Sequence, residues 1–403
     1  MKKQCARVAY FPCVYHEIDG VGQTARHFSA FARRHDIPFF MVHSGPQDEV
    51  SFEGSVTRIQ LKRGRVKFPL DRAHDYDLLF LRHYKRVEAL LHEFRADVVQ
   101  ITGPSDVGTL GAMCAHKMKI PLAASWQTNL HEYSRRRASA ALSFLPNELA
   151  QKIAEAAERW SFRATARFYK IPRLLFAPNR ELVRLLEQAT GKPCYLMSHA
   201  VDTEVFRPEL RDRGEGPFRI GYVGRLTAEK NVRMLARLEQ ALVRMGHTNF
   251  QFVIVGEGAE SAWLRENMQR IELTGVLTGR ELSRKFANFD LLAFPSETDT
   301  FGLVVLEAFA SGVPAVVTDR GGPQFSVCHG STGYIARNFD EFASYTAQLM
   351  TQPELLSTMR VAAREQALTT SWDRIFEGMH DAYKRCLSQT AVATESLLHV
   401  ATT

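Results

Sequence analysis

Residues 218–231 read FRIGYVGRLTAEKN, and this stretch decides the fold of the second half of the chain. Its apolar part, Phe218–Val223, has the composition of a strand that is buried on both faces of a parallel sheet. Gly224 ends the strand, and a helical pattern follows Asn231. A strand, a glycine turn and a helix in this order form one unit of a doubly wound α/β fold, in which ligands bind at the carboxyl ends of the strands.

Two cations, Arg225 and Lys230, lie in the turn of this unit. A planar guanidinium, an ammonium group and the free N–H groups of a helix N-terminus together suit a diphosphate. The alternative is a pair of surface cations on an ordinary loop. The turn alone leaves both interpretations open.

A second unit of the same kind follows the predicted strand Leu291–Phe294. Its loop contains Glu297, Asp299, Phe301 and Gly302, and the next helix carries Glu307 in an otherwise apolar run. A carboxylate that accepts two hydrogen bonds is the usual group for binding the two ribose hydroxyls. A charge in an apolar run is costly unless it is paired, so a structural salt bridge is the alternative for Glu307. Gly302 would let a phosphate or sugar approach the backbone closely.

Strand and helix patterns alternate along the rest of the chain. Strands are predicted at 7–12, 38–43, 98–102, 121–127, 174–177, 252–255 and 314–317, and helices at 23–34, 147–169 and 180–188. The polar stretch 205–217, with its prolines and glycines, is predicted to be a linker. Two successive strand–helix series predict two doubly wound, Rossmann-like domains, 1–200 and 206–370.

The two loops together resemble glycosyltransferase family 4, the retaining nucleotide-sugar transferases with the two-domain GT-B fold. The resemblance covers nearly the whole chain and implies that the domains face each other across a cleft, with a helix at about 372–388 returning to the first domain. It implies that Arg225 and Lys230 bind the donor diphosphate and stabilise the leaving group. The carboxylate pair of the family corresponds to Asp299, beside the transferred sugar, and Glu307, on the ribose. Asp299 is one methylene shorter than the glutamate of the family, which makes Glu297 an alternative.

The resemblance assigns further donor-binding residues. Gly224, Phe301 and Gly302 belong to the two donor loops, and Gly20 and Gly22 match the glycine loop of the first domain. Gln127 stands where the family usually has a histidine for the sugar 6-hydroxyl, and an amide can also donate and accept. His131, four residues later, is a candidate contact to the sugar or acceptor, although a structural histidine is the simpler interpretation.

No metal or cofactor is expected, because Arg225, Lys230 and helix N-termini would neutralise the diphosphate. Asp75 and Asp77 form a D-x-D sequence, which we interpret as helix capping in a loop before a helix. Gly20-Val-Gly22-Gln-Thr-Ala25 also fits a loose dinucleotide fingerprint, but the predicted strand ends too early for the tight turn of an NAD enzyme. The 6 cysteines are scattered without a C-x-x-C pair, which predicts reduced thiols.

The charge is uneven along the chain. Residues 1–192 carry a net charge of +11 and the remainder −4, although the chain has only +7 overall. Basic runs at Lys62–Lys67 and Arg135–Arg137 suggest docking on an anionic membrane surface, with a solvated basic face as the alternative. The sequence predicts neither a signal peptide nor a spanning helix, so we expect a cytoplasmic protein, peripheral on the inner face of the plasma membrane. No nucleic-acid motif is evident.

The resemblance implies a hexosyltransferase that moves a hexose from a UDP- or GDP-linked donor with retention, and the charge pattern suggests a membrane lipid or cell-envelope glycan as the acceptor. A soluble sugar or small-molecule acceptor is the first alternative. A non-catalytic basic protein that binds membranes or nucleic acid is the second.

Overall fold

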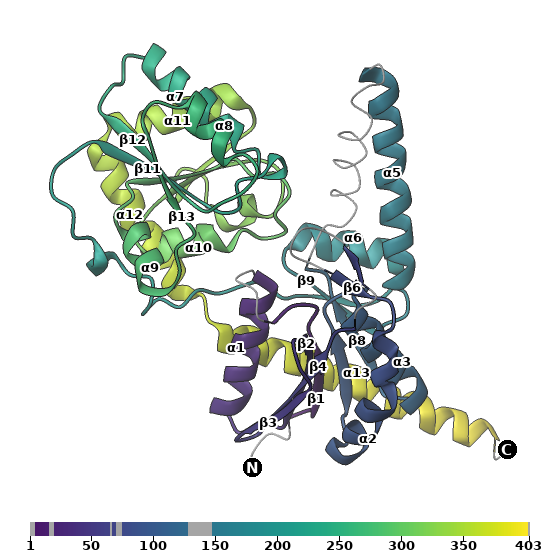
Figure 1. Cartoon of the computed structure of the whole chain (residues 1–403). Coiled ribbons are helices and arrows are strands. Elements are labelled where there is room, and N and C mark those ends of the chain that lie inside the picture. The colour runs from purple at the N-terminus through teal and green to yellow at the C-terminus, as the bar shows by residue number, and fades with distance from the viewer. Residues whose placement is uncertain (1–4, 16–19, 65–66, 70–74, 128–146, 402–403) are drawn as a thin grey trace. The chain divides into compact units, whose positions relative to one another are not determined.

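A computed structural model describes residues 5–15, 20–64, 67–69, 75–127 and 147–401 of this α/β protein (Figure 1). Its contacts divide the chain into two compact units. The first comprises 1–131, 155–198 and 372–403, and the second comprises 132–154 and 199–371. Each unit contains its own mainly parallel sheet with helices on both faces, which confirms the predicted fold class of two doubly wound domains.

The first unit is built on an eight-stranded sheet in the order β10-β9-β8-β7-β1-β2-β4-β3. Every neighbouring pair is parallel except the β3–β4 hairpin. Its elements are β1 (Val8–Phe11), α1 (Gly20–Arg34), β2 (Phe39–Gly45), β3 (Glu49–Glu53), β4 (Val56–Lys62), β5 (Lys67–Pro69), β6 (Asp75–Asp77), the 3-10 helix η1 (Phe80–His83), α2 (Tyr84–Phe94), β7 (Val98–Ile101), α3 (Asp106–Met118), β8 (Leu122–Ser125), most of α5 (Asn147–Phe168), β9 (Leu174–Ala177), α6 (Arg180–Thr190), β10 (Cys194–Leu196) and α13 (Trp372–Ala401).

The second unit is built on a six-stranded, wholly parallel sheet in the order β13-β12-β11-β14-β15-β16. This order reverses between β11 and β14, which is the switch point where doubly wound sheets bind ligands. Its elements are η2 (Pro208–Leu210), β11 (Phe218–Val223), η3 (Ala228–Lys230), α7 (Arg233–Arg244), β12 (Phe250–Val255), α8 (Ser261–Asn267), β13 (Ile271–Gly275), α9 (Gly279–Ala287), β14 (Leu291–Phe294), α10 (Leu303–Ala310), β15 (Ala315–Thr318), η4 (Pro323–Ser326), β16 (Gly333–Ala336), α11 (Phe339–Thr351) and α12 (Pro353–Thr369).

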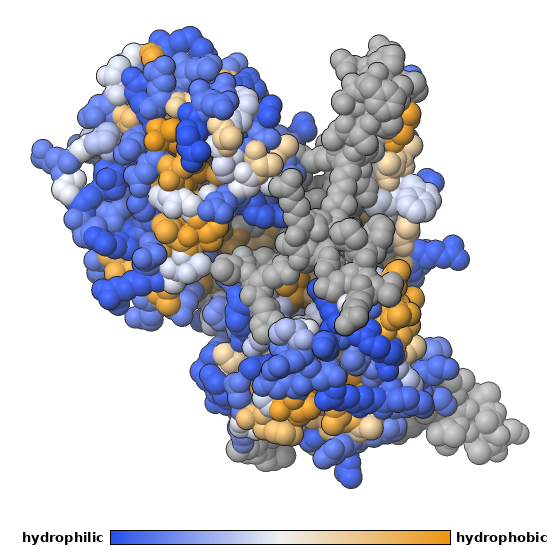
Figure 2. Space-filling view, in the orientation of Figure 1, coloured by the Kyte–Doolittle hydropathy of each residue, from blue (hydrophilic) through white to orange (hydrophobic). Residues whose placement is uncertain are grey.

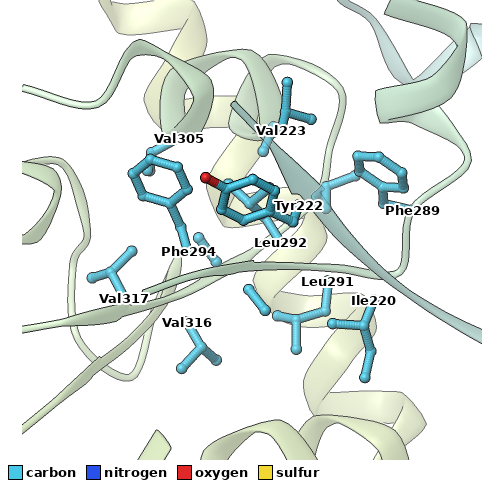
Figure 3. Close-up of a cluster of buried hydrophobic side chains, with 14 of the residues drawn as sticks. Ile220, Tyr222, Val223, Phe289, Leu291, Leu292, Phe294, Val305, Val316 and Val317 are labelled. Carbon is cyan, nitrogen blue, oxygen red and sulfur yellow. The ribbon is translucent and has the colours of Figure 1, made fainter. Parts of the chain in front are cut away.

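The core of the second unit lies on the two strands that flank the switch point. Ile220 and Tyr222 of β11 and Leu291 of β14 are completely buried. The ring of Tyr222 stacks beside that of Phe294, with 5.8 Å between the ring centroids (Figure 3). Large side chains therefore fix the positions of the two strand ends from which the candidate site is built.

The core of the first unit depends on α13, which comes from the end of the chain. Phe376 of this helix stacks on Phe28 of α1 at 4.4 Å between ring centroids. The phenol of Tyr383 donates a hydrogen bond to the side-chain oxygen of Gln100 in β7 at 3.3 Å. A returning helix was expected at about 372–388, and the helix observed runs from Trp372 to Ala401.

One hairpin was not predicted, and two local expectations are wrong. The hairpin of β3 and β4 was missed, because its strands mix polar and apolar residues. The supposed linker 205–217 is fixed to the second unit, because Arg211 and Arg213 both bind the buried carboxylate of Asp290. The stretch Asp75–Asp77 is a short strand paired with β5 and not a loop.

Candidate functional site

The first donor loop continues β11 beyond the sheet edge. The Gly224 N–H donates to the carbonyl of Val255 at 3.0 Å, which extends the pairing with β12 by one residue. The phenol of Tyr222 donates to the carbonyl of Arg225 at 3.1 Å. The loop ends in η3, which contains Lys230, and in Asn231, which has a left-handed backbone with φ 54°. Strand pairing and a buried tyrosine thus hold the backbone around both predicted cations.

The second donor loop, after β14, is fastened to the first. The Thr298 hydroxyl donates to the carbonyl of Glu229 at 3.1 Å. On its other side, the Gly322 N–H donates to the carbonyl of Asp299 at 2.6 Å. A Cβ on Gly322 would lie 2.0 Å from the carbonyl oxygen of Thr300, so only glycine permits this approach. The two loops and the segment around Gly322 therefore form one packed layer at the edge of the sheet.

An ion pair joins the two loops at the centre of this layer. The Lys230 ammonium lies 2.6 Å from the Asp299 carboxylate, and Lys230 is only 9% exposed. Burial acts to raise the pKa of Asp299, but the Lys230 ammonium, together with the Ser296 hydroxyl and the charge of Arg225, more than offsets this effect, so the pKa lies below its ordinary range. Asp299 is therefore ionised at neutral pH, and the resulting pair of fixed charges is preorganised for a charged ligand.

Arg225 is much more accessible than Lys230. Its side chain is 51% exposed and lies 4.0 Å from the Glu229 carboxylate, the separation of a weak ion pair. The guanidinium is attached to the fixed backbone described above. It is therefore available to a ligand that arrives at the carboxyl end of β11.

The helix α10 begins at the second donor loop without a side-chain cap. Its N-cap residue is Gly302, whose φ of 83° lies in the left-handed region that favours glycine. The first N–H groups of such a helix attract anions. Glu307 lies in the middle of α10 and is 6% exposed, which places a buried carboxylate one turn below this N-terminus.

Phe301 precedes Gly302 and is also buried. Its ring contacts the ring of His199, with 4.6 Å between centroids. Burial lowers the pKa of His199 to about 4, so this histidine is neutral at pH 7. Glu297 is partly exposed at the start of the same loop.

The remaining predicted residues belong to the first unit. Gln127 follows β8 and is buried near the phenol of Tyr10. Gly20 and Gly22 lie in the first turn of α1, and not in a loop before it as expected. All three follow the carboxyl ends of parallel strands and so lie at one edge of the first sheet. His131 and Arg135–Arg137 lie outside the described residues.

Of the two aspartates in the D-x-D sequence, the structure describes the side chain of Asp77, which is held by nearby donors. Asp77 accepts hydrogen bonds from the Gly64 and Leu79 N–H groups, and its carboxylate lies 2.7 Å from the Arg82 guanidinium. Despite burial, these donors hold the pKa of Asp77 below its usual range. In the described part of the chain, no group of three or more His, Cys, Asp or Glu side chains is placed to hold a metal ion.

Sequence reasoning missed three residues that shape the donor loops. Tyr222 and Thr298 fasten the loops by side-chain hydrogen bonds, and Asn231 adopts the left-handed turn before α7. The signal for Asn231 was present, since asparagine is among the few residues that tolerate this conformation. The partners of Tyr222 and Thr298 are backbone carbonyls, which a sequence pattern does not reveal.

Comparison with known proteins supplies the family. The model described as "Glycosyltransferase Family 4" matches residues 18–205, and that described as "Glycosyl transferases group 1" matches residues 217–352. A GDP-mannose-dependent alpha-mannosyltransferase of Corynebacterium glutamicum is 28% identical over 299 residues, 72% of this chain and 67% of the relative. A protein of the same name from Mycolicibacterium smegmatis is 27% identical over 317 residues, 76% of this chain and 78% of the relative.

Solved structures agree on the fold. Sucrose-phosphate synthase from Thermosynechococcus elongatus superposes with a TM-score of 0.72 at 16% identity, over 95% of this chain and 99% of that one. Anabaena HepE in complex with UDP and glucose gives 0.65 at 14% identity, over 94% and 99%. The matching family models and the named relatives are glycosyltransferases, which favours this interpretation over an NAD enzyme or a non-catalytic basic protein. The chain belongs to the family 4, group 1 glycosyltransferases and has their two-domain GT-B fold.

Proposed function

We propose that this enzyme transfers a hexose from a nucleotide-diphosphate sugar, with retention of the anomeric configuration, and binds the donor diphosphate with Arg225 and Lys230. The observation that carries the proposal is the buried Lys230–Asp299 pair at the carboxyl end of β11. Arg225 and the uncapped N-terminus of α10 belong to the same packed layer. A diphosphate is the substrate group that suits two cations and a helix N-terminus.

The chemistry follows from where charge develops. As the bond from the anomeric carbon to the donor phosphate breaks, negative charge grows on the leaving diphosphate. Cations held in place before the reaction stabilise that charge without reorganisation, and this is the role that we assign to Arg225 and Lys230. Asp299, ionised beside Lys230, is assigned to the transferred sugar, where positive charge develops on the ring. Retention is expected from the family and needs no metal in this scheme.

The donor is proposed to be GDP-mannose. The support is the name of the relatives in Corynebacterium glutamicum and Mycolicibacterium smegmatis, which are called GDP-mannose-dependent mannosyltransferases. Glu307 is assigned to the ribose hydroxyls and Gln127 to a sugar hydroxyl. UDP sugars are the alternative, because solved structures of the same fold were obtained with UDP and glucose.

The acceptor is proposed to be a lipid or lipid-linked glycan at the inner face of the plasma membrane. The support is the net charge of +11 in residues 1–192 against −4 in the remainder. No helix in the described part of the chain is both long and apolar enough to cross a membrane. Attachment would thus be peripheral and electrostatic, with a soluble sugar acceptor as the alternative.

A panel of nucleotides and nucleotide sugars tests the donor assignment. Thermal unfolding should shift upward with GDP and GDP-mannose, and donor hydrolysis should be measurable without an acceptor. The variants Arg225→Ala and Lys230→Ala should lose most of the shift, whereas Arg244→Ala, an exposed cation elsewhere on the second unit, should keep it. If no nucleotide changes the unfolding temperature, or if the shift survives in both loop variants, the assignment is wrong.

A further inference from the structure

The helix α5, Asn147–Phe168, has two different long faces in its second half. The inner face packs on the first unit: Ala166 is buried, and the ring of Phe162 lies 6.2 Å from that of Trp126. Tyr169, just after the helix, is also buried and donates a hydrogen bond to the carbonyl of Ser125 at 3.0 Å. This half of α5 is therefore anchored beside the carboxyl end of β8.

The opposite face carries exposed apolar side chains. Trp160 is 73% exposed and Ile171, in the turn after the helix, is 63% exposed. Arg163 and Arg167 lie three and seven residues after Trp160, which puts all of them on one side of the helix. Lys170 is exposed in the same turn as Ile171. We call Trp160, Arg163, Arg167, Lys170 and Ile171 the α5 outer face. Figure 2 shows hydrophobic side chains among hydrophilic ones along the visible edge of this helix.

From Arg159 onward, α5 and the turn after it carry only positive charges. Residues 159–173 contain five arginines and lysines and no aspartate or glutamate. Within the part of the chain that the structure describes, Arg163, Arg167 and Lys170 form no side-chain ion pair or hydrogen bond. By contrast, Arg63 in the basic run first suspected lies 3.3 Å from the buried Asp106 carboxylate and is neutralised by it. Arg163, Arg167 and Lys170 thus place three unpaired positive charges beside the exposed Trp160 and Ile171.

We propose that the α5 outer face docks the enzyme on an anionic phospholipid bilayer. An exposed tryptophan and isoleucine enter the interface between headgroups and acyl chains, while the flanking cations pair with lipid phosphates. A large tryptophan side chain exposed to water is unfavourable, because its apolar surface stays hydrated, and transfer into the membrane interface would remove this cost. A nucleic acid is the poorer fit, because the face offers one aromatic ring and an isoleucine, and not several rings spaced for stacking.

Because α5 packs beside the carboxyl end of β8, docking would bring this edge of the first unit close to the membrane. The value of this position for an acceptor rests on the proposed function. The inner face of α5 contacts Trp126, and Tyr169 just after the helix is hydrogen-bonded to Ser125. The next residue after Trp126 in the chain is Gln127. Docking through the outer face would therefore hold this edge of the first unit about one helix diameter, roughly 10 Å, from the lipid surface. A lipid acceptor could then reach it without leaving the bilayer completely.

Vesicle flotation of the full chain tests the proposal. Phosphatidylcholine vesicles that contain phosphatidylglycerol should carry the protein at least about tenfold better than phosphatidylcholine alone, and high salt should release it. Trp160→Ala should lower the partition by about tenfold. The double variant R163E/R167E should lower it by at least about 25-fold, since each cation contributes about fivefold.

Two matched controls and one spectroscopic measurement isolate the surface. Phe52→Ala removes a 74% exposed aromatic side chain from β3, and Arg244→Glu reverses an exposed charge on α7; both variants should float like the wild type. Brominated lipids should quench tryptophan fluorescence in the wild type, and this quenching should vanish in Trp160→Phe. Trp126 and Trp372 are buried, and the partly buried Trp263 belongs to the second unit.

The outcomes separate this proposal from the proposed function. GDP-dependent thermal shift should be unchanged in Trp160→Ala and R163E/R167E, which also shows that the variants are folded. If the wild type ignores anionic vesicles, or both variants float normally, the docking surface is refuted while the donor assignment stands. If the wild type binds single-stranded RNA but no vesicles, and the same variants lose this RNA binding, the α5 outer face binds nucleic acid and the proposal is overturned.

Discussion

The carboxyl edges of the two sheets use charge in opposite ways. In the first unit the buried carboxylates Asp77 and Asp106 are paired with arginines. The residue assigned to substrate there, Gln127, is neutral. In the second unit Lys230 and Asp299 are paired across two loops that a ligand can approach, with the half-exposed Arg225 beside them. Because both edges are formed mainly by the carboxyl ends of parallel strands, this difference predicts that the second unit recognises charge and the first forms neutral hydrogen bonds.

The largest effect is expected from removing a cation of the second unit. Lys230→Ala and Arg225→Ala should each lower kcat/KM about a hundredfold, since one preorganised contact to developing charge contributes about 3 kcal/mol. In contrast, Arg82→Ala in the first unit should lower the melting temperature, because it strands the buried Asp77, but leave kcat/KM nearly unchanged. Steady-state kinetics and thermal melts of the three variants decide between these roles. Near-normal turnover of both loop variants would contradict the comparison.

The next effect concerns how the charged edge is held. Gly322→Ala places a methyl group against the Thr300 carbonyl and should push the second donor loop away from its neighbour. We expect a loss of stability of about 1–3 kcal/mol and weaker binding of GDP. Gly216→Ala, where nothing lies within 4 Å, is the matched control and should behave like the wild type. Calorimetry of both variants with and without nucleotide measures this. If Gly322→Ala binds GDP normally, the packed layer does not position the cations.

A smaller effect should distinguish the two units by specificity. Glu307→Gln should weaken every sugar on the same nucleotide by about tenfold, because it alters contacts to ribose hydroxyls. Gln127→Ala should change the preference among sugars on that nucleotide and leave the affinity for free GDP unchanged. Competition binding with a series of GDP sugars gives both values. An effect of Glu307→Gln on only one sugar would move this residue to the sugar pocket.

The smallest effect is expected from chelation. EDTA should leave transfer unchanged within error, because the diphosphate charge is assigned to Arg225, Lys230 and the N-terminus of α10. Activity that disappears with EDTA and returns with Mg²⁺ or Mn²⁺ would contradict this assignment, because the second unit would then need a metal ion to neutralise the diphosphate.

Sequence patterns predicted the parallel sheets better than the details of the edges. The strands Phe218–Val223, Leu291–Phe294 and Leu174–Ala177 were placed at the observed bounds, because a strand buried on both faces is a continuous apolar run that turn residues interrupt. The β3–β4 hairpin was missed, because a strand with one solvent-exposed face alternates polar and apolar residues. It therefore lacks the continuous apolar run that marks a buried strand.

The candidate site was predictable only as a set of residue types. Resemblance to the family selected Lys230 and Asp299, but their direct pairing joins residues 69 positions apart and depends on how two loops pack. The close approach at Gly322 and the hydrogen bond from Thr298 to Glu229 involve backbone carbonyls of other loops, to which no local pattern points. The start of α1 at Gly20 shows the reverse case, since a glycine-rich stretch was expected to remain a loop.

The helix α13 has a consequence for how the protein is made. It completes the first unit, yet it is synthesised after the whole of the second. Phe28 of α1 can pack on Phe39 early, but it lacks its stacking partner Phe376 until that residue has left the ribosome. All six strands of the second sheet come from one uninterrupted stretch of the chain, 199–371. We therefore expect the second unit to fold first during translation, although it comes second in the sequence, and the first unit to close last around the end of the chain.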